Sequence, residues 1–298
     1  MFKSIFLNRH SELRSGWRIL LFCTILGVIA AAGIVPLDHF GMLNMFVEAL
    51  ILLAAAVAAT YCMTRFINRK PFKSVGFSLH PGVFREVGSG CLLGFLMTTG
   101  IFLIEFGLGF IHLSSLEISA SRIAWAIGSS LMIFAAGACV EELLFRGYLF
   151  QTLMQGVTFL PAMLLMATFF ALAHAQNPKV SVFGLINVAF AAIWFSFAYL
   201  KTRSLWLPIA LHFSWNFCQT TLYSFPTSGI AFQEQKIFSL VQTGPDWITG
   251  GSFGPEGGAL ATLALLICTV YILKASYLSA PEGILTLDSV EDLLPPPS

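Results

Sequence analysis

Charged side chains are scarce in this chain. Lys, Arg, Asp and Glu make up 10% of its 298 residues, whereas 57% are hydrophobic, and the mean hydropathy is +0.81. Soluble domains carry about 25% charged residues, so this composition excludes an ordinary soluble domain and is typical of a polytopic membrane protein. The formal net charge of +1 also argues against a nucleic-acid partner, because such binding needs a basic face.

Several common motifs are missing as well. The six cysteines all fall in apolar segments without a Cys-x-x-Cys spacing, so neither a disulfide framework nor a cysteine zinc site is indicated. The sequence has no His-Glu-x-x-His zinc-protease motif. No internal repeat stands out, although secondary transporters are often built from two related halves.

Long apolar runs, by contrast, are abundant. A membrane-spanning helix needs about 20 mostly apolar residues. The first run follows several cations and ends in three alanines, which also resembles a signal peptide, but a first span is favoured because the preceding polar segment is long. We expect an all-α fold with about eight transmembrane helices, at roughly 17–35, 43–63, 87–112, 123–140 (or on to 153), 158–175, 180–200, 205–223 and 258–275.

The runs define one transmembrane domain, expected at 17–278. A cytoplasmic segment (1–16) would precede it, and a polar, acidic tail (279–298) is expected to be disordered. Lys and Arg are concentrated before the first run, after the second and after the sixth, so the positive-inside rule places both termini in the cytoplasm. The short N-terminus and compact spans favour the inner membrane of a bacterium.

A few ionisable residues lie inside the apolar runs, where charge is expensive and therefore indicates a functional site. In Glu141-Glu142-x-x-x-Arg146, residues four apart share a helix face, so Glu142 and Arg146 can pair. Glu141 lies about 100° around the helix and is left free. A purely structural ion pair would explain Glu142 and Arg146 but not Glu141, so we predict that Glu141 is the reactive carboxylate.

Two further patterns follow, Phe170-x-x-x-His174 and His212-x-x-x-Asn216. Alone, His174 suits an interfacial residue, and His212 with Asn216 could equally well serve hydrogen bonding between helices. Together with Glu141, however, two imidazoles and a carboxamide can activate water and stabilise an oxyanion. This combination suits the hydrolysis of an amide.

The ordered set of three motifs resembles the CPBP family of intramembrane proteases, which includes the Rce1-type CAAX prenyl endopeptidases and the bacterial Abi proteins. The resemblance covers roughly 124–222, and Phe253–Gly258 also resembles a segment common in bacterial members. It implies an endopeptidase in the lipid bilayer that hydrolyses a peptide bond in a prenylated or membrane-associated peptide or protein.

The resemblance also implies a role for each residue. Glu141 would be the principal catalytic carboxylate, and His174 its partner in activating water. His212 and Asn216 would bind the oxyanion. The supporting residues would be Glu142, Arg146 and Phe170.

The family is described both as metalloproteases and as glutamate-type proteases. Glu141, His174 and His212 could hold one zinc ion with an open position, and a metal-free site is slightly favoured. The alternatives to a protease are a bacteriocin self-immunity protein or membrane scaffold without peptidase activity, or a proton-coupled transporter. A protease needs these three residues around one cavity, yet the expected topology puts His174 near the outer end of its span and His212 in the inner half of another.

Overall fold

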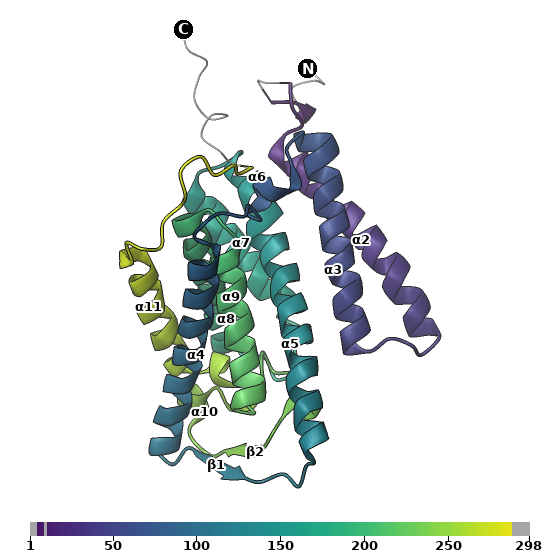
Figure 1. The fold of residues 1–298 in the computed structure, drawn as a ribbon. Coiled ribbons are helices and arrows are strands. Elements are labelled where there is room, and N and C mark those ends of the chain that lie inside the picture. The colour runs from purple at the N-terminus through teal and green to yellow at the C-terminus, as the bar shows by residue number, and fades with distance from the viewer. Residues whose placement is uncertain (1–4, 9–10, 288–298) are drawn as a thin grey trace.

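The computed structural model describes residues 5–8 and 11–287, and these residues form a helical bundle with one short sheet (Figure 1). The predicted all-α, polytopic fold is confirmed. The longer helices are α2 (Ser15–His39), α3 (Met45–Cys62), α4 (Val83–Gly107), α5 (Ala120–Glu142) and α8 (Val182–Thr202). The shorter ones are α6 (Phe150–Met154), α7 (Phe159–Ala173), α9 (Trp206–Phe217), α10 (Asp246–Thr249) and α11 (Ala259–Lys274).

Several helices continue into π-helical segments. These segments are η1 (Met63–Asn68) after α3, η3 (Leu143–Leu149) between α5 and α6, and η4 (Cys218–Leu222) after α9. Because η3 joins α5 to α6, the fourth expected span does continue beyond 140, as far as Met154. Four 3-10 turns complete the helical elements: η2 (Phe72–Val75), η5 (Gln233–Gln235), η6 (Gly251–Phe253) and η7 (Pro255–Gly257).

Each of the expected apolar runs is helical. Five helical segments are long and apolar enough to cross a membrane, namely 15–39, 45–68, 83–107, 120–154 and 182–202. The fifth, seventh and eighth runs form the shorter helices α7, α9 and α11. The chain is therefore an integral membrane protein in which some helices stop short of a full span of about 20 residues.

The bundle is arranged around α9, which packs against α4, α5 and α8 (Figure 1). Helices α7 and α11 cover α8, and α2 and α3 form a hairpin at the side that contacts α5 and α6. Strands β1 (Ile111–Ser114) and β2 (Ser239–Gln242) pair antiparallel, with Ile111 opposite Gln242, at the end of the bundle far from the start of α2.

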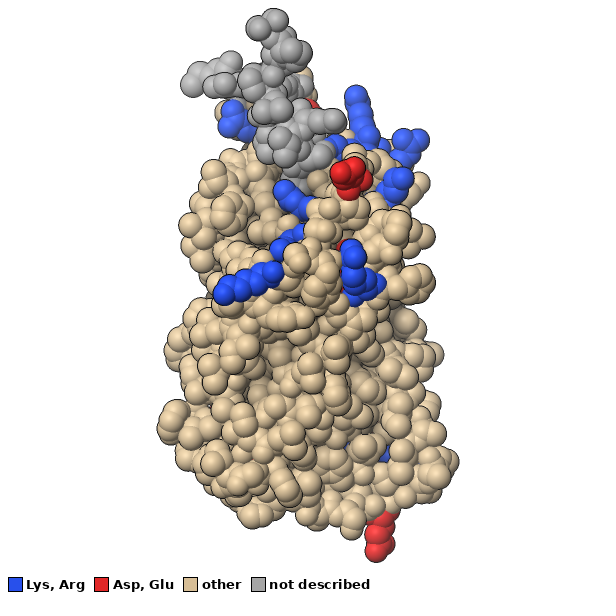
Figure 2. Space-filling model, turned by 60° about the vertical axis from the view of Figure 1, so that its left-hand side comes forward, with Lys and Arg blue, Asp and Glu red and all other residues tan. Residues whose placement is uncertain are grey.

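Charge is unevenly distributed on the face drawn in Figure 2. Lys and Arg gather in the upper part, and the broad region beneath them is almost free of charged side chains. An uncharged belt of this kind is what contact with lipid acyl chains requires. Figure 2 thus agrees with the composition in placing the bundle in a bilayer.

Glycines allow α4 to approach α9 closely. A Cβ at Gly90 would lie 2.6 Å from the Cβ of Ala210, and a Cβ at Gly94 would lie 2.8 Å from the Cβ of Ser214. The Ser214 hydroxyl donates across this contact to the carbonyl oxygen of Cys91 (2.7 Å). Small residues spaced by four let helix backbones meet in a membrane, and here they fix the helix that carries the second histidine motif.

The segment after α11 returns to the bundle. Leu287 is fully buried, and its N–H donates to Oε1 of Gln151 (2.9 Å). Lys70 Nζ donates to the carbonyl oxygens of Thr286 (3.3 Å) and Leu287 (3.2 Å). Thr286 and Leu287 are therefore packed against the bundle, where their backbone finds partners. Residues 288–298 lie outside the described residues, and disorder there stays a prediction.

Replacing Gly94 by Ala should destabilise the protein. The added Cβ would lie 2.8 Å from the Cβ of Ser214 and 2.9 Å from the backbone nitrogen of Trp215, so α4 and α9 must separate. We expect a loss of roughly 1–3 kcal/mol, the usual cost of overpacking, measured by thermal unfolding in detergent. Gly100→Ala on the same helix is the control, since its Cβ would meet none of the described atoms within 4 Å. Equal melting temperatures for the two variants would contradict this account of the contact.

Candidate active site

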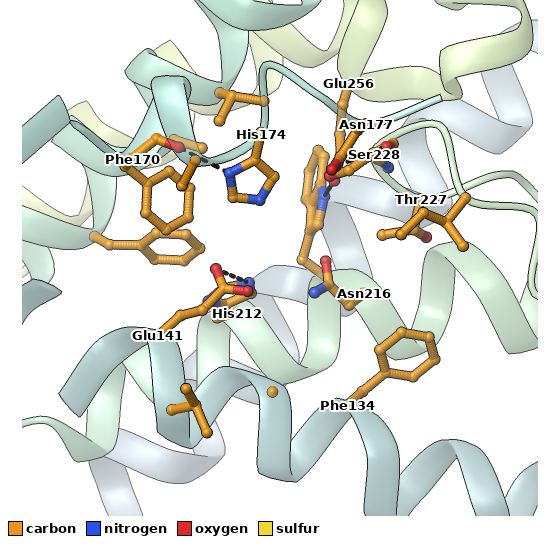
Figure 3. A pocket seen from close by; sticks show the side chains of 18 of the residues that line it. Phe134, Glu141, Phe170, His174, Asn177, His212, Asn216, Thr227, Ser228 and Glu256 are labelled. Atoms are coloured by element: carbon orange, nitrogen blue, oxygen red, sulfur yellow. Dashed lines mark hydrogen bonds and ion pairs between the residues drawn. The ribbon is translucent and has the colours of Figure 1, made fainter. Parts of the chain in front are cut away.

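A cavity of about 620 Å³ lies inside the bundle, between α3, α5, α7, α8, α9 and the loop before α11 (Figure 3). The structure brings Glu141, His174, His212 and Asn216 together around this cavity, although they come from two helices (α5 and α9) and the end of a third (α7). Most of the remaining lining is apolar. The other polar lining residues are Glu48, Asn177, Asn187, Thr227, Ser228 and Glu256.

The predicted pair between Glu142 and Arg146 is confirmed. Arg146 donates from Nη1 to Glu142 Oε1 (3.2 Å), and both side chains are buried. Its Nη2 donates to the carbonyl oxygen of Ala192 (2.8 Å), and its guanidinium lies over the rings of Phe170 (4.8 Å) and Phe195 (5.0 Å). The cation is thus enclosed by a carboxylate, a carbonyl and two aromatic faces, as a charge at membrane depth requires.

Glu142 has a second partner, which the sequence spacing did not predict. His212 Nδ1 lies 2.8 Å from Glu142 Oε1, and the imidazole stacks on Phe195 with 4.7 Å between ring centres. Because Glu142 is held as a carboxylate by Arg146, it accepts a hydrogen bond and Nδ1 carries the hydrogen. The other ring nitrogen, Nε2, is 3.8 Å from Glu141 Oε2.

The two neighbouring glutamates differ in exposure. The side chain of Glu141 is 33% exposed, whereas that of Glu142 is 0% exposed. Figure 3 shows Glu141 facing the cavity beside His212 and below His174. Its Oε2 is buried and accepts no hydrogen bond from the described residues. The expected contrast between the two glutamates therefore holds in geometry, and His212 contacts both of them.

His174 is oriented by the residue one turn before it. Its Nδ1 lies 2.8 Å from the carbonyl oxygen of Phe170, and the two rings lie 4.7 Å apart. A carbonyl only accepts, so Nδ1 carries the hydrogen and Nε2 keeps its lone pair. The expected mismatch in depth disappears, because His174 at the end of α7 and His212 on α9 line the same cavity. Phe170 then reaches both histidines, with 6.4 Å between its ring and that of His212.

The loop before α11 supplies site residues that sequence reasoning missed. Glu256 lines the cavity and accepts a hydrogen bond from the indole N–H of Trp215 (2.9 Å), next to Asn216. It also accepts from the Ser228 hydroxyl (2.7 Å). Asn177 donates from Nδ2 to the carbonyl oxygen of Ser228 (3.0 Å). The signal for Glu256 was its glycine-rich segment, whereas nothing in the sequence linked Asn177 to the site.

Zinc binding by Glu141, His174 and His212 stays a prediction. In the described ranges, no three His, Cys, Asp or Glu side chains are grouped closely enough to hold a metal ion as placed. The Nδ1 atoms of His174 and His212 are engaged by Phe170 and Glu142, as is usual in metal-binding histidines, and each ring keeps Nε2 for another partner.

The fold and the cavity define a helical integral membrane protein with a carboxylate–imidazole site inside its bundle. Residues 122–218 match the family model of the Rce1-like proteins, described as type II CAAX prenyl endopeptidases. This match confirms the resemblance inferred from the three motifs, and it contains all of them.

The chain is also similar to a curated bacterial protein. The chain is 27% identical to the uncharacterized protein YyaK of Bacillus subtilis (strain 168) over 164 residues, which are 53% of this chain and 54% of that protein. The chain thus spans about half the length of the curated relative that it matches.

Truncating Glu142 to Ala should destabilise the protein far more than truncating its neighbour. Arg146 would be left as an uncompensated buried charge, and breaking a buried pair costs about 3–5 kcal/mol. Glu141→Ala is the matched control, because this side chain is partly exposed to the cavity. Thermal unfolding in detergent measures both variants. If both lower the melting temperature equally, the structural role of Glu142 is refuted.

Proposed function

We propose that the protein is an intramembrane endopeptidase that hydrolyses a peptide bond through a water activated by Glu141. The observation that carries this proposal is the approach of Glu141 Oε2 to His212 Nε2 (3.8 Å) in a cavity that His174 and Asn216 also line. The match of 122–218 to a family described as endopeptidases supports protease chemistry.

The first step is the activation of water. Glu141 Oε2 accepts no hydrogen bond from the described residues, and the neutral ring of His174 offers a lone pair on Nε2 because Nδ1 donates to Phe170. Water between them would pass a proton to Glu141 as its oxygen attacks the substrate carbonyl carbon. Collapse of the tetrahedral intermediate then breaks the C–N bond, and Glu141 returns the proton to the departing amine.

The second requirement is a set of donors for the oxyanion. The carboxamide of Asn216 faces the cavity, one turn after His212 (Figure 3). A His212 ring protonated on both nitrogens would donate Nδ1–H to Glu142 and Nε2–H to the oxyanion. Glu141 and Glu142 flank that ring and balance its charge. Donors fixed in advance inside a water-poor site stabilise developing charge strongly.

The surroundings favour a membrane-associated substrate. The cavity walls are mainly apolar, and the lining includes Met45, Ala49 and Leu52 of α3, so apolar groups of a peptide or lipidated protein have a place beside the polar centre. A volume of about 620 Å³ suits a short peptide segment. The substrate class we propose is therefore a peptide or lipidated protein at the bilayer.

The orientation follows from the cations. Lys and Arg gather at the end where α2 begins and α3 ends (Figures 1 and 2). The positive-inside rule places that end in the cytoplasm. We therefore propose that both termini are cytoplasmic and that the membrane is the inner membrane of a bacterium.

Glu141→Gln is the decisive variant. The amide keeps the size of the side chain but cannot take the proton from water, so cleavage of a membrane-peptide reporter by purified protein should fall at least about 100-fold, as for loss of a general base. The melting temperature, measured in parallel, confirms that the variant is folded. Cleavage within tenfold of the wild type would refute the role of Glu141, and absence of cleavage by the wild type would favour an immunity, scaffold or transport role.

Metal removal distinguishes the metal-dependent from the glutamate-type mechanism, the two that are associated with the family. Since Glu141 and His174 activate water in our proposal, we expect cleavage to survive treatment with 1,10-phenanthroline followed by removal of the chelator. Elemental analysis of the active, treated protein provides the measurement. Loss of cleavage that zinc restores would instead assign the water to a metal ion.

A further inference from the structure

We infer that Glu256 is a positioning residue whose carboxylate holds together the two walls of the cavity that carry His174 and Asn216. This inference deepens the proposed function and rests on it. Glu256 lies in η7, just before α11, far along the chain from both walls. Figure 3 shows it at the side of the cavity with Ser228 and Asn177.

The carboxylate accepts three hydrogen bonds. Oε1 accepts from Nε1 of Trp215 (2.9 Å), and Oε2 accepts from both the backbone N–H and the hydroxyl of Ser228 (2.7 Å each). Hydrogen bonds to a carboxylate are shorter and stronger than those between neutral groups. Because all three partners are donors, both carboxylate oxygens of Glu256 have to act as acceptors.

The first wall is α9. Trp215 is 5% exposed, packs against Trp194 with 6.3 Å between ring centres, and directly precedes Asn216. Fixing the indole N–H therefore fixes the rotation of α9 at the point where the proposed oxyanion donor projects. His212 lies on the same helix, one turn earlier.

The second wall is the end of α7. Ser228 has a φ of +48°, a left-handed conformation that a serine rarely adopts, and its N–H and hydroxyl both point to Glu256. Its carbonyl oxygen accepts from Asn177 Nδ2 (3.0 Å), and the backbone N–H of Asn177 donates to the carbonyl oxygen of His174 (3.1 Å). A continuous chain of hydrogen bonds thus connects Glu256 to the proposed water-activating histidine.

The backbone at Glu256 is itself fixed by hydrogen bonds and close packing. Asn187 of α8 donates from Nδ2 to the carbonyl oxygens of Glu256 and Gly258 (2.9 Å each), and its Oδ1 accepts from the hydroxyl of Thr262 in α11 (2.7 Å). Gly254, with a φ of +90°, lies so close that any Cβ would clash with the carbonyl oxygen of Pro226. Contacts with α8 and α11 therefore fix the position of Glu256, and its carboxylate in turn fixes both walls of the cavity.

Glu256→Gln tests the inference. Its amide presents an NH₂ to one of the donors, so one wall should lose its support. We expect kcat for the peptide reporter to fall about tenfold to 100-fold, the effect of a small displacement of reacting groups, while KM changes less than about threefold because the substrate pocket remains. Hydrogen exchange of 174–178 and 226–230 should accelerate in the same variant.

Glu105→Gln is the matched control. Glu105 is a fully buried carboxylate that does not line the cavity, and it accepts from Gln242 Nε2 (3.2 Å) in the same long connection between α9 and α11. This variant should leave kcat unchanged and the exchange of 174–178 unaffected. Trp215→Phe keeps an aromatic ring and removes the indole donor together with part of the ring volume. It provides a second variant should Glu256→Gln fail to fold, and a lower kcat is expected there as well.

The outcomes separate the two proposals. If the wild type cleaves the reporter and Glu256→Gln or Trp215→Phe lowers kcat as stated, the inference is supported. Unchanged kcat in folded variants overturns it and leaves the proposed function intact. If the wild type cleaves nothing, the proposed function fails. In that case, hydrogen exchange of Glu256→Gln tests whether Glu256 joins the two walls. If exchange at 174–178 is not faster than in the wild type, the inference is overturned as well.

Discussion

The buried charge pair of Glu142 and Arg146 is the constraint on which the rest of the site depends. A cation enclosed at this depth must be compensated, and Glu142 compensates it while also receiving His212 from a helix about seventy residues later in the chain. One carboxylate oxygen therefore joins α5 to α9. Because that oxygen fixes one nitrogen of the imidazole, the other nitrogen has to point towards Glu141.

The same constraint gives the two glutamates different environments. Glu142 is buried against Arg146 and His212, whereas Glu141 lines the cavity. The two environments differ although the two residues are adjacent on one helix. The π-helical segment η3 begins directly after them, and such segments occur frequently at functional sites. Packing by Phe170 and Phe195 around Arg146 and the histidines then excludes lipid and limits water. The same few contacts therefore determine the charge of the site, the orientation of its side chains and the exclusion of water.

Much of this arrangement could be predicted from local sequence patterns. Apolar runs predicted the helices, and i, i+4 spacing predicted the pairing of Glu142 with Arg146, because both depend only on neighbours along a helix. The contact of His212 with Glu142 could not be predicted, since it depends on how α9 meets α5, which the glycines of α4 help to set. Nor could the sequence predict that His174 and His212 line one cavity, since this depends on how the end of α7 packs in the bundle. Asn177 was missed because its partner, Ser228, comes from a loop without any periodicity.

The docking of Leu287 has a consequence for biosynthesis. Gln151 accepts from the Leu287 N–H and donates to the carbonyl oxygens of Val75 and Arg146, so the end of the described chain contacts the helix turn that carries the buried cation. A nascent chain inserts its segments in order, and this contact is among the last that can form. The hydrogen bond of Gln151 to Leu287, next to the charged centre, thus forms only after synthesis has passed residue 287.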